Sequence, residues 1–138
     1  VSPIASLTII VDDLNNDRFE DVVKAIEALP AGGLNDFMAP LLAAWSSVSQ
    51  GQSAAQALNH LNPLLKDGSK PLYYLHKAMI LDFKGQQKNA VKSYQDEIKE
   101  EGGVSLRVFQ LLGNLFRRMG DNAQAELLFR NFIVTMKS

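Results

Sequence analysis

The segments GQQKNAVKSY (residues 85–94) and GDNAQAELLF (residues 120–129) match at three corresponding positions. Each begins with a glycine, has an alanine five residues later and has an aromatic residue nine residues later. Each glycine follows an apolar pattern of helical spacing, where a glycine in left-handed conformation commonly ends a helix. The alanine lets helices approach closely, and the aromatic ring can fill the space between them. The two segments therefore predict a repeated pair of helices with a glycine turn inside each pair.

These glycines belong to a series of nearly constant spacing. Gly51 precedes Gly85 by 34 residues, and Gly85 precedes Gly120 by 35. Counting 34 residues back from Gly51 reaches Asp17, in an equivalent predicted turn. Any one such glycine is most often a simple helix stop, as in a generic helical bundle, but the common period indicates a repeat that runs through the whole chain.

Two copies of this pattern resemble the tetratricopeptide repeat (TPR-like) family, whose 34-residue unit is an antiparallel helix pair. The matching residues of the third copy are Tyr74, Ala78, Leu81, Gly85, Ala90 and Tyr94, and those of the fourth are Phe109, Leu112, Gly113, Phe116, Gly120, Ala125 and Phe129. The third copy departs from the family at Lys77, and the second departs at Pro40, Ser47, Gln56 and Pro63. The run GGLNDFMAPLLAAW (residues 32–45) is similar to segments of longer bacterial proteins of this class.

The resemblance implies an all-α fold, a right-handed α-α superhelix (solenoid) of about four antiparallel pairs, or about eight helices. We expect one domain over residues 1–138. Its degenerate units are expected at about 4–33 and 37–67, and its better units at 71–101 and 106–137. Helical spacing of apolar residues dominates the chain, and breakers at residues 30–33, 67–71 and 102–103 separate helices of roughly 12 to 15 residues.

The composition excludes several classes of partner and site. A net charge of −1 gives no electrostatic reason to expect nucleic acid or an anionic membrane, and no apolar run approaches the roughly 18 residues of a membrane span. Without cysteine, the chain has no disulfide and no thiolate metal site. Its compartment stays open between the cytoplasm and a bacterial periplasm. No targeting peptide is visible, and we expect the sequence to be part of a longer protein.

In the tetratricopeptide family, ligands usually lie on the concave side, which the first helix of each pair lines. The resemblance therefore points to positions 13, 10, 6 and 3 residues before each turn, which fall on one stripe of a helix. The stripe is apolar through three copies except at Asp82, and it becomes polar and basic in the fourth, at Arg107, Gln110, Asn114 and Arg117. The stripe residues that we expect to bind a partner are Met38, Leu41, Trp45, Leu75, Met79, Arg107, Asn114 and Arg117. In the alternative, the apolar positions are core and the arginines, with Arg118, form a solvated helix face.

This pattern predicts a noncatalytic scaffold that binds a helix or peptide segment of another protein. The apolar stripe would hold the segment, and Arg107, Arg117 and Arg118 would pair with its acidic residues or its carboxylate. The alternative is a structural self-assembly module. Both ends of the chain, PIASLTIIV (residues 3–11) and AELLFRNFIV (residues 125–134), are apolar, which favours a homodimer or packing on further repeats.

Catalytic and metal-binding patterns are missing from the sequence. The only histidines, His60 and His76, are 16 residues apart; we expect His60 on the core-facing aromatic position of its repeat and His76 on a helix surface beside the stripe. Adjacent carboxylates such as Glu100 and Glu101 diverge by about 100° around a helix, so they form no acid/base pair. The glycine pairs at residues 32–33 and 102–103 lack the Lys and Ser/Thr of a phosphate loop. We expect no enzyme, no cofactor and no metal.

Overall fold

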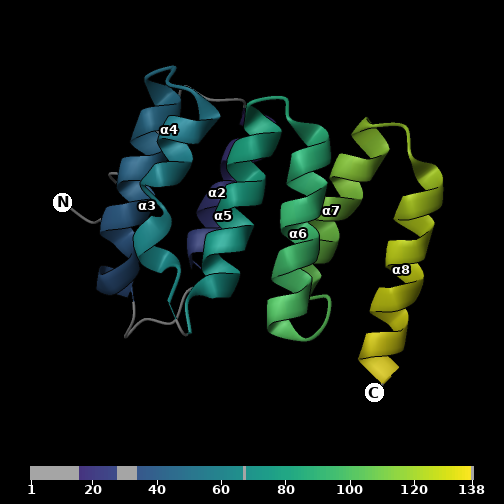
Figure 1. The fold of residues 1–138 in the computed structure, drawn as a ribbon. Helices are drawn as coiled ribbons and strands as arrows, with labels where there is room; N and C mark the ends of the chain where they lie inside the picture. The colour runs from purple at the N-terminus through teal and green to yellow at the C-terminus, as the bar shows by residue number, and fades with distance from the viewer. Residues whose placement is uncertain (1–15, 28–33, 67, 138) are drawn as a thin grey trace. The chain divides into compact units, whose positions relative to one another are not determined.

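The computed structural model describes residues 16–27, 34–66 and 68–137, and this part of the chain is all-helical. It contains seven α-helices and one 3₁₀ helix and no β-strand (Figure 1). The chain forms two compact units, Val1–Ser69 and Lys70–Ser138, which are taken in turn below. The all-α prediction is thereby confirmed for the described residues. The first helix expected in the unit at residues 4–33 lies outside them.

The first unit contains α2 (Asn16–Glu27), α3 (Leu34–Ser49), α4 (Ala54–Asn59) and the 3₁₀ helix η2 (Asn62–Leu64). α3 packs against both α4 and η2. α4 begins with a capping box, because the Ser53 hydroxyl accepts from the Gln56 N–H while the Gln56 side chain accepts from the Ser53 N–H. The buried apolar residues of the described part of this unit are Val22, Ala25, Met38, Leu41, Ala44, Trp45, Val48, Ala54, Ala57, Leu61 and Leu64.

Pro40 and Pro63 have different effects on the helices of this unit. α3 continues through Pro40, whereas α4 ends after six residues, much earlier than the 12 to 15 that the repeat pattern predicts. In a continued helix, Pro63 would lack the N–H that donates to the Asn59 carbonyl four residues earlier, and its ring would clash with that carbonyl. The helix therefore ends at Asn59, and the chain turns into η2, in which Pro63 occupies an early position that tolerates it.

The second unit is a series of four helices, α5 (Lys70–Phe83), α6 (Gln87–Glu101), α7 (Leu106–Arg118) and α8 (Asn122–Lys137). Consecutive helices run in opposite directions, so that α5 with α6 and α7 with α8 form two antiparallel pairs (Figure 1). α6 also packs against α7. The first pair covers residues 70–101 and the second covers residues 106–137.

The glycine turns that define the repeat have the same backbone geometry. Gly51, Gly85 and Gly120 have φ of 77°, 80° and 77°, in the left-handed region that only glycine adopts without strain. In each turn the residue after the glycine donates its N–H to the carbonyl five residues earlier, over 2.9–3.1 Å. This hydrogen bond is the Schellman motif that closes a helix end. The prediction that these glycines end the first helix of each pair is confirmed.

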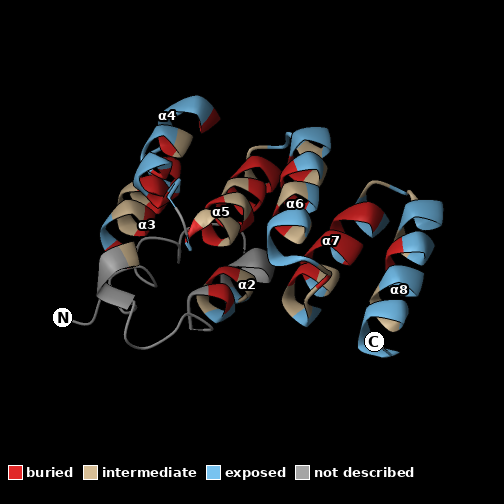
Figure 2. Ribbon diagram, turned by 60° about the horizontal axis from the view of Figure 1, so that its bottom comes forward, coloured by how far each residue is buried: buried red, intermediate tan, exposed pale blue. Residues whose placement is uncertain are grey.

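Burial is uneven among the helices of the second unit. α5 buries residues along more than one face, and α7 buries Val108, Leu111, Leu112, Leu115 and Phe116. α8 buries only Leu128, and nearly all of its surface is exposed (Figure 2). Leu127, Phe129, Val134 and Met136 of α8 are each at least half exposed. α8 therefore presents apolar side chains that this unit does not cover.

Candidate functional site

The apolar residues of the predicted stripe are buried. Met38, Leu41 and Trp45 are 3%, 0% and 0% exposed, and in the second unit Leu75 and Met79 are 9% and 4% exposed. These five side chains offer almost no surface to a partner in this structure. Their burial agrees with the alternative in which the apolar positions are core.

The polar residues of the stripe all lie on α7. Arg107 is half-buried, and its Nη1 donates to Oε1 of Gln110 over 3.3 Å. Asn114 and Arg117 are exposed. The structure thus keeps the polar end of the predicted site accessible, on the same helix pair that carries the exposed apolar residues of α8.

Arg118 has a structural partner within the second unit. Its Nη1 and Nη2 donate to Oδ1 and Oδ2 of Asp82 over 2.8 and 2.6 Å, a bidentate ion pair between the ends of α7 and α5. Asp82 is 5% exposed, so the guanidinium compensates a carboxylate that has lost most of its water. Arg118 remains 40% exposed, and its ion-pair partner is a residue of its own chain, which the sequence pattern did not predict. Asp82, the one polar residue among the apolar stripe positions, was the signal that could have indicated this contact.

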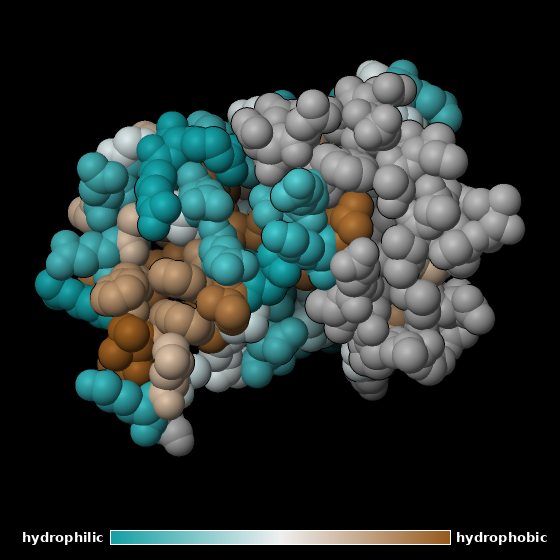
Figure 3. Space-filling model, turned by 180° about the vertical axis from the view of Figure 1, so that it is seen from behind, coloured by the Kyte–Doolittle hydropathy of each residue, from teal (hydrophilic) through white to brown (hydrophobic). Residues whose placement is uncertain are grey.

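A cluster of apolar side chains is exposed over α7 and α8, and we call it the aromatic face. The Phe109 ring of α7 stacks on Phe132 of α8, with centroids 4.6 Å apart and 8° between the planes, and it lies 6.2 Å from the Phe129 ring. Leu106 is 58% exposed, Phe129 52% and Met136 67%. Figure 3 shows the corresponding gathering of hydrophobic atoms where α7 and α8 lie, at the left of that view. The aromatic face consists of Leu106, Phe109, Phe129, Phe132 and Met136.

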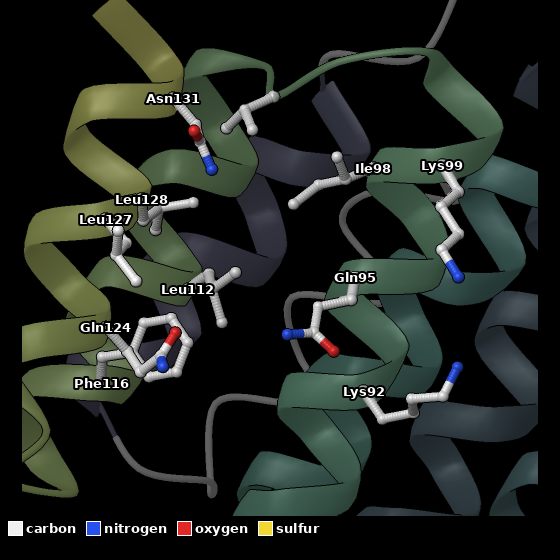
Figure 4. A pocket seen from close by; sticks show the side chains of 11 residues that line it. Lys92, Gln95, Ile98, Lys99, Leu112, Phe116, Gln124, Leu127, Leu128 and Asn131 are labelled. Carbon is white, nitrogen blue, oxygen red and sulfur yellow. The ribbon is translucent and has the colours of Figure 1, made fainter.

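A pocket of about 450 Å³ lies between α6, α7 and α8, and we call it the α6–α8 pocket. Leu112 and Phe116 of α7 lie at its back, with Leu127 and Leu128 of α8 on one side (Figure 4). Polar residues of α6 form the opposite side, among them Lys92 and Lys99. The Lys92 ammonium is held by Asp96 at 2.7 Å. The pocket is open, partly apolar and rimmed by amines, and no nucleophile and base face each other among its lining residues.

A buried carboxyl group lies on α6, outside the pocket lining. Glu97 is 2% exposed, and its Oε1 has no hydrogen-bond partner. Burial, the charge of Glu101 and a hydrogen bond with Glu101 together raise the pKa of Glu97 to about 8, and burial is the largest of these causes. Glu97 and Glu101 are separated by one helical turn, so they lie on the same side of α6, unlike the adjacent carboxylates Glu100 and Glu101. Glu97 is therefore held as a neutral acid at pH 7.

The two histidines lie opposite to what the repeat predicts. His60 is exposed, because α4 ends at Asn59 and does not carry it into the core. His76 on α5 is fully buried, and burial lowers its pKa to about 3. Both expectations were wrong, since they assumed regular repeats with only one covered face per helix. Within residues 16–27, 34–66 and 68–137, no cluster of three His, Cys, Asp or Glu side chains could hold a metal ion.

Comparisons with known proteins add no relative. No family model matches the chain, and neither a curated protein nor a solved structure matches it. The described helices include none that is long and apolar enough to cross a membrane. The resemblance to tetratricopeptide repeats therefore stays a prediction.

Proposed function

We propose that the chain is a noncatalytic protein-interaction module of tetratricopeptide-like helix pairs, and that it binds a partner protein on the aromatic face. The observation that carries this proposal is the exposure of Leu106, Phe129 and Met136 on the helices that also carry the partly exposed, stacked rings of Phe109 and Phe132. Large exposed apolar clusters on soluble proteins are typical of interaction sites. Aromatic residues and methionine are also enriched at protein interfaces, where they are frequent energetic anchors.

The energetic reason is the cost of leaving these side chains in water. Removing apolar surface from water contributes roughly 25 cal/mol per Å², and fully burying one large apolar side chain contributes about 1.5 to 3 kcal/mol. Phe129 and Met136 have more than half of their surface available for this gain. The rings of Phe109 and Phe132 are already held against each other by stacking, which lowers the entropy lost on binding.

The repeat architecture supports a role in recognition rather than in chemistry. Stacked helix pairs that share the turns at Gly51, Gly85 and Gly120 are the units from which we propose that a superhelix is built. The pairs α5–α6 and α7–α8 would be its third and fourth units. Such scaffolds hold the framework residues constant and bind through the side chains that differ between copies.

Photo-crosslinking at the aromatic face tests the proposed function. A photoreactive phenylalanine analogue replaces Phe129 in cells that produce the protein natively, and a second variant carries it at Leu127, on the pocket side of α8. Both positions are about half exposed, at 52% and 50%. We expect a discrete adduct with another protein from position 129 and a weaker one or none from position 127. Equal, diffuse labelling at both positions would contradict a specific binding surface.

The same exposed residues favour a second candidate, self-assembly. Apolar residues such as Met136 could be covered by another copy of the chain, and the association would then depend on concentration. Light scattering across a concentration series separates the two functions. A particle that stays monomeric up to high concentration contradicts self-assembly and leaves the partner protein as the occupant.

A further inference from the structure

We propose that the aromatic face receives an amphipathic helix of the partner protein, parallel to α7, whose last turn carries an aspartate or glutamate that pairs with Arg117. This inference rests on the proposed function and adds the chemistry of the partner. It follows from comparing the two helix pairs of the second unit, because the α5–α6 pair already receives a helix in the equivalent place, namely α7.

Equivalent residues of the two pairs differ sharply in exposure. The pairs superpose in sequence with an offset of 35 residues, which relates Gly85 to Gly120 and Tyr94 to Phe129. Tyr94 is 1% exposed, whereas Phe129 is 52% exposed. α6, which carries Tyr94, packs against the following helix α7, and α8 is the last helix that the structure describes. Phe129 thus occupies the repeat position that is covered in the preceding pair.

α7 shows what kind of helix such a position accepts. It packs against α6 and buries one apolar side, which includes Val108, Leu115 and Phe116. It runs parallel to α5 in Figure 1, and the contact between Arg118 and Asp82 joins the C-terminal turns of both helices. The occupant that matches this arrangement is an amphipathic helix lying parallel to α7, with its apolar side on the aromatic face.

The charge at the end of the face is reversed between the two pairs. With the same offset of 35 residues, Asp82 of α5 corresponds to Arg117 of α7. Asp82 accepts the bidentate pair from Arg118 of the helix that packs on its own pair. Arg117 is exposed, and the ion pairs found among the described residues do not include it. A partner helix that docks as α7 does would place one residue, the equivalent of Arg118, against the guanidinium of Arg117. An aspartate or glutamate is favoured at that position of the partner helix.

The aromatic face is also more apolar than the equivalent surface of the α5–α6 pair, which favours an apolar occupant. The buried acid Glu97 of α6 corresponds to Phe132 of α8, and the exposed Glu101 corresponds to Met136. Two acidic positions of one pair are thus apolar in the other. The partner helix needs a continuous apolar side, with its charge confined to the end that meets Arg117.

A displayed helix library tests this proposal with the full chain as bait. The probes are helices with the length and Ser cap of α7, with apolar residues at the positions that α7 buries and all amino acids at the position of Arg118. We expect Asp and Glu to be enriched over Lys and Arg by about tenfold at that position, the ratio of a well-formed ion pair. The Arg117→Asp bait should reverse the preference. Arg117 is exposed, so this variant keeps the fold.

Two further baits locate the binding and separate this inference from the proposed function. Phe129→Glu should abolish capture of the selected helices, whereas Leu127→Glu, equally exposed on the pocket side of the same helix, should leave it unchanged. If Phe129→Glu abolishes capture but the selected helices show no preference for an acid, the charge inference is overturned and the proposed function stands. Capture that Phe129→Glu leaves intact overturns both, and so does a library that yields no binder.

A second copy of the chain is the competing occupant. Light scattering of the wild type and of Phe129→Glu distinguishes it, because a dimer that this substitution dissociates would place another copy on the aromatic face. That result overturns the proposal of a partner helix. A monomer in both cases, together with acid-selective capture, supports it.

Discussion

Glu97 and His76 are buried titratable residues whose effects on stability oppose each other along the pH scale. The pKa of Glu97 rises from 4.5 to about 8 on folding, so the folded state binds more protons between these values and stability falls as the pH rises through this range. The pKa of His76 falls from 6.5 to about 3, so stability falls as the pH drops below 6.5. Stability should therefore be greatest in mildly acidic solution.

Replacing Glu97 by the neutral isostere glutamine should remove the alkaline loss. At pH 4 the Glu97→Gln variant and the wild type should have similar free energies of unfolding, because Glu97 is neutral in the folded state and mostly neutral in the unfolded state there. Towards pH 8 the wild type should lose up to about 1.4 kcal/mol per pH unit, and the variant should not. Urea unfolding at a series of pH values measures this difference. Glu100→Gln, an exposed change on the same helix, is the control, and parallel pH profiles for Glu97→Gln and the wild type would exclude the effect.

The neighbours Arg117 and Arg118 should differ strongly in their effect on stability. Arg118→Met removes the partner of the buried Asp82 carboxylate and should cost about 2 kcal/mol; fully buried pairs typically lose about 3 to 5, but Arg118 is 40% exposed. Arg117→Met changes an exposed side chain and should stay within about 0.5 kcal/mol. Denaturant midpoints with unchanged slopes would give both values. Equal losses from the two variants would show that the Arg118–Asp82 pair does not stabilise the fold.

At the level of the helices, replacing Gly113 within α7 or Gly120 in the turn after it by alanine should change the free energy of unfolding in opposite directions. Gly120→Ala places a side chain at φ of 77° and should cost about 1 kcal/mol, although open space surrounds the new Cβ. Gly113 lies inside α7, and its Cβ would meet Leu128 Cδ2 at 3.9 Å, an ordinary contact. Gly113→Ala should therefore stabilise by about 0.5 to 1 kcal/mol through helix propensity. Thermal unfolding of both variants checks the signs, and a loss at Gly113 would mean that α7 and α8 pack more closely than described.

Local rules predicted the helices and turns of the second unit, whereas burial depended on more distant contacts. The turn predicted at Asp17 was wrong, because Asp17 lies inside α2. The glycine positions and the apolar spacing predicted where α5 to α8 begin and end, since both signals act within a few residues. The early end of α4 at Asn59 is also local, and Pro63 could have indicated it.

The stripe on α5 could not be assigned to groove or core from its periodicity. Tyr73, His76 and Ile80 are buried in addition to the stripe residues Leu75 and Met79, so this helix is covered on more than one face. Coverage depends on which helices pack around α5, and the spacing within one helix carries no information about that. The Arg118–Asp82 pair joins residues 36 positions apart and was hidden for the same reason.

For the whole chain, the division into two compact units predicts two separable unfolding transitions. Trp45, the single tryptophan, is fully buried in the first unit and reports on it alone, while helical circular dichroism reports on both units. Leu112→Ala in α7 should destabilise the second unit by about 3 kcal/mol and shift the dichroism curve, but not the fluorescence of Trp45. Leu41→Ala in α3 should shift the fluorescence. Coincident shifts of both probes in both variants would indicate one cooperative domain.

The turns at Gly51, Gly85 and Gly120 share one backbone hydrogen bond, from the residue after the glycine to the carbonyl five residues earlier. Side chains elsewhere on the paired helices take no part in this shared bond. Their identities can drift over evolutionary time, or be redesigned in the laboratory, while the framework that displays them keeps its shape. The replacement of an aspartate by Arg117 at equivalent places of two copies is one such change, and further changes of specificity would need no new fold.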